Sequence, residues 1–247
     1  MRDRRAMVIE TPLPGRTHRG KVRDTYDLGN GLLLMVATDR ISAFDVVLPT
    51  GIPDKGLVLN QLSAFWFDRT AHLVPNHLQY LADSPDAGPY LQESTFGPSM
   101  TSEIARQAML VRRAERVDIE CIVRGYITGS AWSEYRRQGT VSGRTMEAGL
   151  VEGQVFPEPL FTPTTKAVEG HDENMSPQQV LDMVGSELAQ KLEETSKVVY
   201  QHAHDYAKKQ GIILADTKME FGVLDGQLIL IDELLTPDSS RFWDACG

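Results

Sequence analysis

The sequence contains few cysteines and no long apolar segment, and each shortage excludes a class of protein. Only Cys121 and Cys246 occur among the 247 residues, and their separation fits neither a metal site nor a disulfide framework. No apolar run is long enough to span a membrane, and the arginine-rich opening MRDRRAMVIE lacks the apolar core of a signal peptide. We therefore expect a cytoplasmic protein without disulfides, in which Cys121 is a buried thiol.

An excess of positive charge is also missing. The chain carries 25 Lys and Arg residues against 34 Asp and Glu residues, a net charge of −9, and its basic residues are dispersed. We therefore expect no nucleic-acid partner and no membrane partner, and small molecules are the expected ligands. Neither a P-loop nor a Rossmann glycine fingerprint is present. A chain of this length can form one domain or two lobes.

The segment over residues 212–241 carries the clearest chemical pattern. Read with period two, it places Ile213, Ala215, Met219 and Phe221 on an apolar face and Asp216, Lys218 and Glu220 on a polar face. Asp225-Gly226 predicts a hairpin turn, and a second apolar run then leads into Asp232 and Glu233. The pattern predicts two antiparallel strands with charged side chains on one face.

The length of that turn decides which carboxylate joins the polar face, because a slip of one residue turns every side chain over. A two-residue turn at Asp225-Gly226 would put Glu233 beside Glu220, whereas a three-residue turn over 224–226, with a left-handed glycine, would put Asp232 there. We favour the three-residue turn, because carboxylates about 7 Å apart along a strand and about 5 Å apart across it can share a divalent cation. The alternative is the solvated outer face of an edge hairpin.

A second candidate lies near the N-terminus, where residues 20–28 and 32–38 predict two strands joined by the turn sequence GNG. Gly20 is followed by the cations Lys21 and Arg23. A glycine and cations on a hairpin can place N–H groups and positive charge over a polyphosphate. An exposed basic hairpin without a ligand explains the pattern equally well.

Two further groups of polar residues fit either a site or an ordinary structural role. Ser42 and Asp45 follow a predicted buried strand that ends in Asp39-Arg40, a place where site residues and helix caps both occur. Arg124 lies just before Ser130, which we expect to begin a helix. An arginine beside a helix start can bind a phosphate or carboxylate, or it can form an ordinary salt bridge at the rim of the protein surface.

A proline-rich stretch over residues 157–177 predicts a long loop that carries Lys166, His171 and Asp172. Loops dense in charge are usually solvated, but long loops in compact domains are often substrate lids. Ser176-Pro177 predicts the start of a short helix. The other patterns predict a surface loop over 82–101, strands over 108–113 and 118–126 in an N-terminal sheet, and a helix over 131–138. They also predict a helix over 57–73, whose core residues are Leu59, Leu62, Phe65 and Trp66. A last helix is expected over 186–210, with an apolar stripe of Leu188, Leu192, Val199, Ala203 and Tyr206.

Six sequence blocks, in order, are GKVRDTYDLG, ATDRISAFD, IECIVRGYITGSAW, PLFTPTTKAVEGHDENMS, LADTKMEFG and LIDELLTPDSSRFW, and they span residues 20–243. In these blocks the chain resembles the phosphoribosylaminoimidazole-succinocarboxamide synthases, the SAICAR synthetase family of purine biosynthesis. The resemblance implies an α+β fold with a kinase-like antiparallel lobe over residues 1–113 and an ATP-grasp-like α/β lobe over 114–247, with ATP between them. It also implies that the carboxylate of the imidazole ribonucleotide CAIR is joined to the amine of L-aspartate, with ATP as co-substrate and Mg²⁺ as cofactor.

The resemblance further implies roles for individual residues. It implies that ATP is bound by Gly20, Lys21, Arg23, Arg112, Glu220 and Asp232, of which Glu220 and Asp232 are also metal ligands. It implies that the substrates are bound by Ser42, Asp45, Arg124, Ser130, Lys166, His171, Asp172 and Arg241. Asp216 and Lys218 would lie in the reaction centre. The sequence contains no convincing Ser-His-Asp or Cys-His arrangement. This agrees with a reaction that activates a carboxylate as an acyl phosphate, because such chemistry needs no protein nucleophile.

Two other functions stay open at this point: a small-molecule kinase of related architecture, and a nucleotide-sensing binding protein without turnover. Phosphate release that depends on aspartate distinguishes all three. Family members usually continue past the last block with a segment that ends in a helix, whereas this sequence ends at RFWDACG. The completeness of the chain, the packing at its C-terminal edge and self-association therefore stay open.

Overall fold

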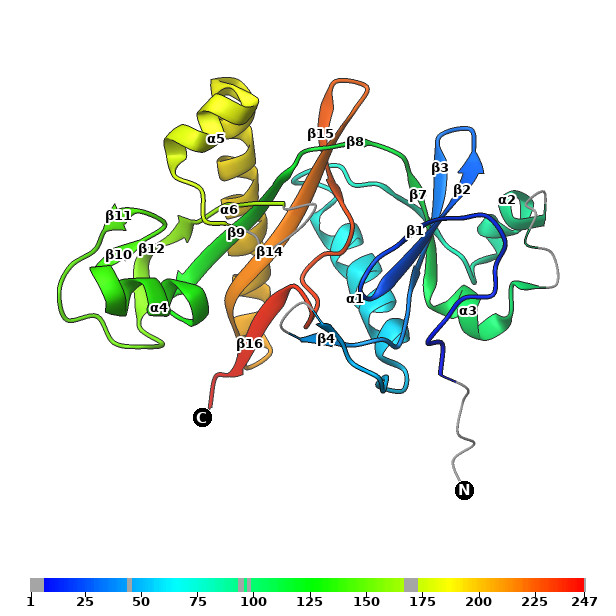
Figure 1. Ribbon diagram of the computed structural model, residues 1–247, viewed down its shortest axis with the longest axis horizontal. Helices are drawn as coiled ribbons and strands as arrows, with labels where there is room; N and C mark the ends of the chain where they lie inside the picture. The colour runs from blue at the N-terminus through cyan, green and yellow to red at the C-terminus, as the bar shows by residue number, and fades with distance from the viewer. Residues whose placement is uncertain (1–6, 44–45, 93–95, 97–98, 167–172, 247) are drawn as a thin grey trace. The chain divides into compact units, whose positions relative to one another are not determined.

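The computed structural model describes residues 7–43, 46–92, 96, 99–166 and 173–246. The chain forms two compact units. The first comprises Met1–Arg69 and Asn76–Ala114, and the second comprises Thr70–Pro75 and Glu115–Gly247. Helices and antiparallel sheets are mixed along the chain (Figure 1), so the predicted α+β class is confirmed. No helix of the described residues is long and apolar enough to cross a membrane.

The first unit is built on an antiparallel five-stranded sheet. Its strands, in spatial order, are β1 Arg16–Arg19, β2 Arg23–Gly29, β3 Leu32–Ala37, β7 Ala108–Arg112 and β6 Leu78–Leu81. The predicted GNG hairpin is confirmed, with Asn30 and Gly31 both at positive φ in a two-residue turn between β2 and β3. The short strands β4 Ser42–Ala43 and β5 Val46–Val47 pair separately.

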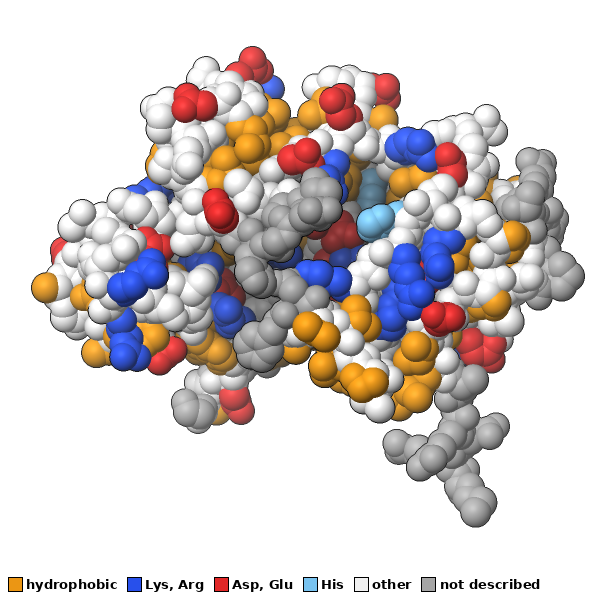
Figure 2. All heavy atoms as spheres, viewed as in Figure 1, with side chains coloured by type: hydrophobic (Ala, Val, Ile, Leu, Met, Phe, Trp, Pro, Cys, Tyr) orange, Lys and Arg blue, Asp and Glu red, His pale blue; other side chains and the backbone are white. Residues whose placement is uncertain are grey.

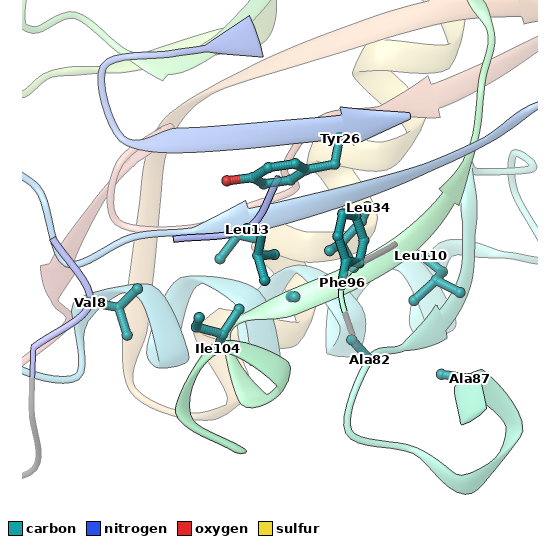
Figure 3. Close-up of a cluster of buried hydrophobic side chains, with 11 residues drawn as sticks. Val8, Leu13, Tyr26, Leu34, Ala82, Ala87, Phe96, Ile104 and Leu110 are labelled. Carbon is teal, nitrogen blue, oxygen red and sulfur yellow. The ribbon is translucent and has the colours of Figure 1, made fainter. Parts of the chain in front are cut away.

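One hydrophobic cluster of the first unit packs against this sheet. Tyr26 from β2, Leu34 from β3 and Leu110 from β7 are fully buried there, and the Tyr26 ring meets Phe96 edge to face at 5.4 Å between centroids (Figure 3). The predicted surface loop over 82–101 is therefore wrong in part. It contributes the buried Phe96 and includes η1 Pro85–Ala87 and α2 Gly88–Gln92, and α3 Ser102–Arg106 follows it.

Helix α1, Lys55–Thr70, confirms the helix expected over 57–73, but its buried face differs from the predicted stripe. Leu59 and Trp66 are buried as expected, whereas Phe65 is 39% exposed and the polar Asn60 is buried. The Asn60 amide nitrogen donates to the Ala108 carbonyl of β7 at 3.1 Å and thereby links α1 to that strand. Hydrophobicity alone therefore misplaced the face by part of a turn.

The second unit is built on a seven-stranded antiparallel sheet around one long strand. Its main path is β12 Val155–Phe161, β9 Ile119–Tyr126, β14 Ile212–Leu224 and β15 Gln227–Ile231, while β13 Thr164–Thr165 pairs with β9, and β8 Glu115–Arg116 and β16 Ser240–Asp244 pair with β14. The expectation that residues 118–126 belong to the N-terminal sheet is wrong, because β9 pairs with β14. The hairpin β10 Thr140–Val141 and β11 Arg144–Thr145 lies outside this sheet.

The proline-rich stretch over 157–177 is not the continuous loop that its composition predicts. Residues up to Phe161 belong to β12, and Thr164-Thr165 form β13. Strand β12 is an edge strand whose pairing with β9 is interrupted between Val155 and Leu160. Proline is tolerated at such positions because no ladder hydrogen bond is lost there.

Three helices complete the second unit: α4 Gly129–Gln138, α5 Pro177–Val184 and α6 Ser186–Lys209. Helix α5 begins at the predicted Ser176-Pro177, and Ser176 forms a capping box with Gln179. Helix α6 packs across β9 and β14 (Figure 1). Its predicted stripe is confirmed at Leu192, Val199 and Ala203, whereas Leu188 and Tyr206 are half-buried.

The hairpin of β14 and β15 has the register that we did not favour. Glu220 pairs with Ile231 and Leu224 pairs with Gln227, so the turn contains two residues, Asp225 and Gly226. The three-residue turn is therefore wrong. Both turn residues have positive φ, of 53° and 77°, and this conformation matches the right-handed twist of the two strands.

Candidate functional site

The two faces of β14 separate packing from chemistry, as the sequence predicts. Ala215, Met219 and Phe221 are buried in the core. Asp216, Lys218 and Glu220 point to the opposite face because side chains alternate along a strand. Figure 2 shows acidic and basic side chains close together over this part of the second unit.

Asp216 lies between two arginines on neighbouring strands. It pairs in register with Arg124 of β9 on one side and with Arg241 of β16 on the other. One oxygen, Oδ2, accepts hydrogen bonds from both, at 2.8 Å from Arg124 Nη1 and 2.5 Å from Arg241 Nη1. One carboxylate between two guanidinium groups leaves a net positive charge, so this Arg–Asp–Arg cluster can bind an anion.

The two arginines differ in their surroundings. Arg124 is buried, and its other nitrogens donate to Thr162 Oγ1 and Ser130 Oγ, each at 3.0 Å. Burial lowers the pKa of Arg124, and the charge of Asp216 counteracts this shift. The side chain of Arg241 is 46% exposed. Arg124 is therefore a fixed part of the cluster, and Arg241 is the accessible one.

The start of α4 fits closely around Arg241. A Cβ atom on Gly129 would lie 2.5 Å from Arg241 Nη2, and Gly129 has a φ of 57°. Only glycine satisfies both conditions. The expectation that Ser130 precedes a helix over 131–138 is corrected by two residues: Thr128 is the N-cap and Gly129 the first residue of the helix, and Ser130 contacts Arg124 instead.

A second charge cluster follows along β14. Lys218 Nζ donates to Glu120 of β9 at 2.8 Å, and Lys166 forms a salt bridge with Glu220. Burial alone would lower the pKa of Lys218, but the charge of Glu120, followed by those of Glu220 and Asp232, raises it above its usual value. Lys218 therefore remains a cation. We call these five residues, Glu120, Lys166, Lys218, Glu220 and Asp232, the Lys–Glu cluster.

Asp232 has a backbone conformation that the sequence reasoning missed. Strand β15 ends at Ile231, and Asp232 has a φ of 66°, so the alternation of side chains stops there. Glu233 is instead held by Thr236, whose hydroxyl donates to it. The charge of Asp232 still contributes to the raised pKa of Lys218, although the turn length from which we predicted this neighbour is wrong.

Glu120 is a site residue that the sequence reasoning missed. It is buried in β9, and its carboxylate faces Lys218 on the neighbouring strand. The signal was present as a single Glu inside the apolar run IECIV. A charged residue in a buried strand needs a partner of opposite charge, and β14 supplies it.

The backbone before the predicted phosphate hairpin in the first unit is held by a buried ion pair. Arg40 Nη2 donates to Asp24 Oδ1 at 2.7 Å and to the Gly20 carbonyl at 3.0 Å, and Arg40 Nε donates to the Lys21 carbonyl. The Gly20 N–H donates to the Arg23 carbonyl at 2.7 Å, which closes a tight turn before β2. Lys21 itself is exposed.

Asp39 has a structural role of the kind the sequence left open. Its carboxylate accepts hydrogen bonds from the N–H groups of Val8 and Gly56 and from the Gln107 amide. Asp39 thus ties three segments of the first unit together. Ser42 lies half-buried on β4.

The remaining predicted residues are Arg112, Asp45, His171 and Asp172. Arg112, on β7, donates from Nη2 to the Asn76 carbonyl at 3.1 Å, and its buried Nε has no partner among the described residues. Asp45, His171 and Asp172 lie outside the described residues. Among those described, no group of three or more His, Cys, Asp or Glu side chains is arranged to hold a metal ion.

Known proteins match the chain over most of its length. The family model of SAICAR synthetase matches residues 16–247. The chain belongs to the SAICAR synthetase family. The phosphoribosylaminoimidazole-succinocarboxamide synthases of Elusimicrobium minutum and Saccharomyces cerevisiae are 53% and 49% identical to it, over 92% and 93% of this chain and 76% of each relative.

Solved structures of the family have the same fold. A SAICAR synthase from Saccharomyces cerevisiae, solved in complex with SAICAR, has a TM-score of 0.87 and 45% identity, covering 99% of this chain and 81% of that one. A SAICAR synthetase solved in complex with ADP has a TM-score of 0.74 and 26% identity, covering 93% and 84%. The predicted family and its α+β fold are therefore confirmed.

Proposed function

We propose that the chain catalyses the reaction of its family, the ATP-dependent joining of the CAIR carboxylate to the amine of L-aspartate to give SAICAR, ADP and phosphate. The observation that carries this proposal within the second unit is the placement of the Arg–Asp–Arg and Lys–Glu clusters on one face of β14. The first cluster can bind an anionic substrate, and the second can bind a cation and a phosphoryl group. The family membership supplies the reaction.

The Arg–Asp–Arg cluster is proposed to receive the ribonucleotide. Arg241 is exposed enough to meet a phosphate or carboxylate, while Arg124 and Ser130 hold Asp216 and the helix start in place. Two guanidinium groups on one carboxylate keep donors available for a second anion. Ser42, Asp45, His171 and Asp172 are proposed as further substrate contacts on the basis of the family motif.

The Lys–Glu cluster is proposed to receive the reacting phosphoryl group and the metal. Glu220 and Asp232 fit Mg²⁺, because carboxylate oxygens are hard ligands and Glu220 already binds the ammonium of Lys166. A magnesium ion on ATP needs only one or two protein carboxylates, since phosphate oxygens and water supply the others. When bound, the ion would neutralise charge on the transferred phosphoryl group. Gly20, Lys21, Arg23 and Arg112 are proposed as the ATP contacts of the first unit.

The protein groups act in this scheme by binding and charge. A carboxylate oxygen of CAIR attacks the γ-phosphorus of ATP, ADP leaves, and the amine of aspartate then displaces phosphate from the acyl phosphate. Lys218, kept protonated by Glu120, stabilises negative charge as the phosphoryl group moves. Cys121 is unsuited to act as a nucleophile, since burial raises its pKa to about 12. We expect the reaction in the cytoplasm, where free thiols persist.

Oxygen-18 in the CAIR carboxylate tests the reaction and its order. Incubation with ATP, Mg²⁺ and L-aspartate should give SAICAR together with phosphate that carries one labelled oxygen. Unlabelled phosphate beside SAICAR would exclude the acyl phosphate. ADP formation without aspartate, with a stable phosphorylated CAIR, would instead indicate a kinase.

A further inference from the structure

Glu134 is a buried carboxylate on α4 that no step of the proposed reaction uses. It is 7% exposed, yet it has no arginine or lysine as a hydrogen-bond partner among the described residues. Its two oxygens accept hydrogen bonds from neutral donors. An ionised group is buried in this way only where several donors compensate for the lost hydration.

The donors come from the hairpin of β10 and β11, from Asn174 and, at 3.5 Å, from Gln138 of α4 itself. Within the hairpin of β10 and β11, Thr140 Oγ1 donates at 2.7 Å, and the N–H groups of Ser142 and Gly143 each donate at 3.0 Å. From beyond the hairpin, Asn174 Nδ2 donates at 3.0 Å. Burial would raise the pKa of Glu134, but the hydrogen bonds from Gly143, Thr140 and Ser142 lower it below its usual value.

Asn174 is part of a small strand-like bridge that ends beside the Lys–Glu cluster. It pairs with Thr164, and the Thr165 N–H donates to the Glu173 carbonyl at 2.9 Å. The Glu173 N–H in turn donates to Thr165 Oγ1 at 3.1 Å. Thr164 and Thr165 also pair with β9, so the bridge is joined to the main sheet.

The residue that follows this bridge is Lys166. Its N–H donates to the Asp118 carbonyl at 3.3 Å, and its ammonium forms the salt bridge with Glu220. The direction of its side chain therefore depends on how Thr165 is held. Thr165 is held on one side by β9 and on the other by the strand that Asn174 fastens to Glu134.

We infer that Glu134 is a positioning residue, which fixes the paired segments 164–166 and 173–175 through Asn174 and thereby places Lys166 on Glu220 for substrate binding. The inference rests on the proposed function only for the role of Lys166. A hydrogen-bonded group behind a site residue typically changes affinity or rate about 10- to 100-fold when it is removed. The carboxylate is suited to this task because both of its oxygens accept: Oε2 from Ser142 and Asn174, and Oε1 from Thr140 and Gly143. Glutamine has only one acceptor oxygen, and its NH₂ group would face an N–H donor.

Two variants test the inference. Glu134→Gln removes the charge with little change in size. Asn174→Ala removes the hydrogen bond between Glu134 and the bridge, while the hairpin contacts of Glu134 and the bond from the Ser142 hydroxyl to the Met175 carbonyl stay intact. Asn174 is exposed, so this variant folds even if the first does not. Glu158→Gln, an exposed residue on β12, is the matched control. Hydrogen exchange at the amides of Thr165, Glu173 and Met175 reports on the bridge without any substrate.

We expect both variants to speed exchange at these amides at least tenfold and to raise KM for CAIR about tenfold, with kcat changed less than threefold. In a Lys166→Ala background, Asn174→Ala should add little to KM, because the residue that it positions is already gone. Unchanged exchange in Asn174→Ala would overturn the inference. Faster exchange with unchanged KM, or additive effects with Lys166→Ala, would overturn the positioning role and show that Glu134 only stabilises the bridge. If the unmodified protein shows no aspartate-dependent turnover, the proposed function fails, while the exchange result still tests the bridge.

Discussion

Substitution of Gly129 by alanine tests whether the helix start of α4 and Arg241 form one anion site. The new Cβ atom would lie 2.5 Å from Nη2 and 2.7 Å from the central carbon of Arg241, so the guanidinium group must move. Moving it breaks the 2.5 Å contact with Asp216. We therefore expect the variant to lose part of its substrate binding as well as some stability.

The expected loss of stability has two parts. Alanine at a φ of 57° costs about 1–2 kcal/mol, because its Cβ atom crowds the following carbonyl oxygen. The broken ion pair adds less than about 1 kcal/mol, since Arg241 is nearly half exposed and its charge is screened by water. A total of about 1–3 kcal/mol lowers Tm by roughly 2–12 °C for a chain of this size.

Gly139, at the other end of α4, supplies the matched control. It has a φ of 70°, but nothing lies within 4 Å of the Cβ atom that alanine would add. Gly139→Ala therefore reproduces the backbone strain without touching Arg241. Calorimetry should give similar falls in Tm for both variants, whereas KM for CAIR should rise about tenfold in Gly129→Ala alone. Equal KM values in the two variants would refute the coupling of Gly129 to the substrate site.

The remaining predictions concern the metal site, the arginine forks and acid stability. Glu220→Gln should lower kcat about a hundredfold at saturating Mg²⁺ without unfolding the chain, because a hard oxygen ligand is lost. Arg124→Lys and Arg241→Lys should each raise KM for CAIR about tenfold and leave KM for ATP nearly unchanged, because lysine lacks the fork geometry. Burial would raise the pKa of Asp24, but hydrogen bonds and charge from Arg40 hold it below its usual value. Its stabilising effect is therefore present above the unfolded pKa of about 3.9 and disappears as pH falls through the lower folded value, so unfolding free energies measured between about pH 5 and pH 2 should fall less steeply in Asp24→Asn.

Each of these predictions has an outcome that contradicts it. Near-normal kcat in Glu220→Gln would remove this residue from the metal site, and Glu158→Gln controls for the loss of one surface charge. A rise in KM for ATP instead of CAIR would move the two arginines to the nucleotide site. A pH dependence in Asp24→Asn as steep as that of the unmodified chain would mean that Asp24 has the same pKa folded and unfolded.

The sequence by itself determined those features whose cause is local. The alternation along β14, the GNG turn and the helix start at Ser176-Pro177 each depend on residues within a few positions of one another, and all three are confirmed. The order of the six blocks identified the family, and the family model that matches residues 16–247 confirms it. The sequence also placed Asp216, Lys218 and Glu220 on one face, since this follows from the period of a strand.

The tertiary structure decided which residues those side chains meet. Whether the Asp225 turn contains two residues or three depends on the packing and twist of both strands, so composition alone could not select the register. The backbone of Asp232 is left-handed after β15, a conformation that no local signal required, and its charge contributes to the raised pKa of Lys218. Glu120 and Glu134 were missed for a related reason: a buried carboxylate is defined by its donors, and these come from residues up to 98 positions away.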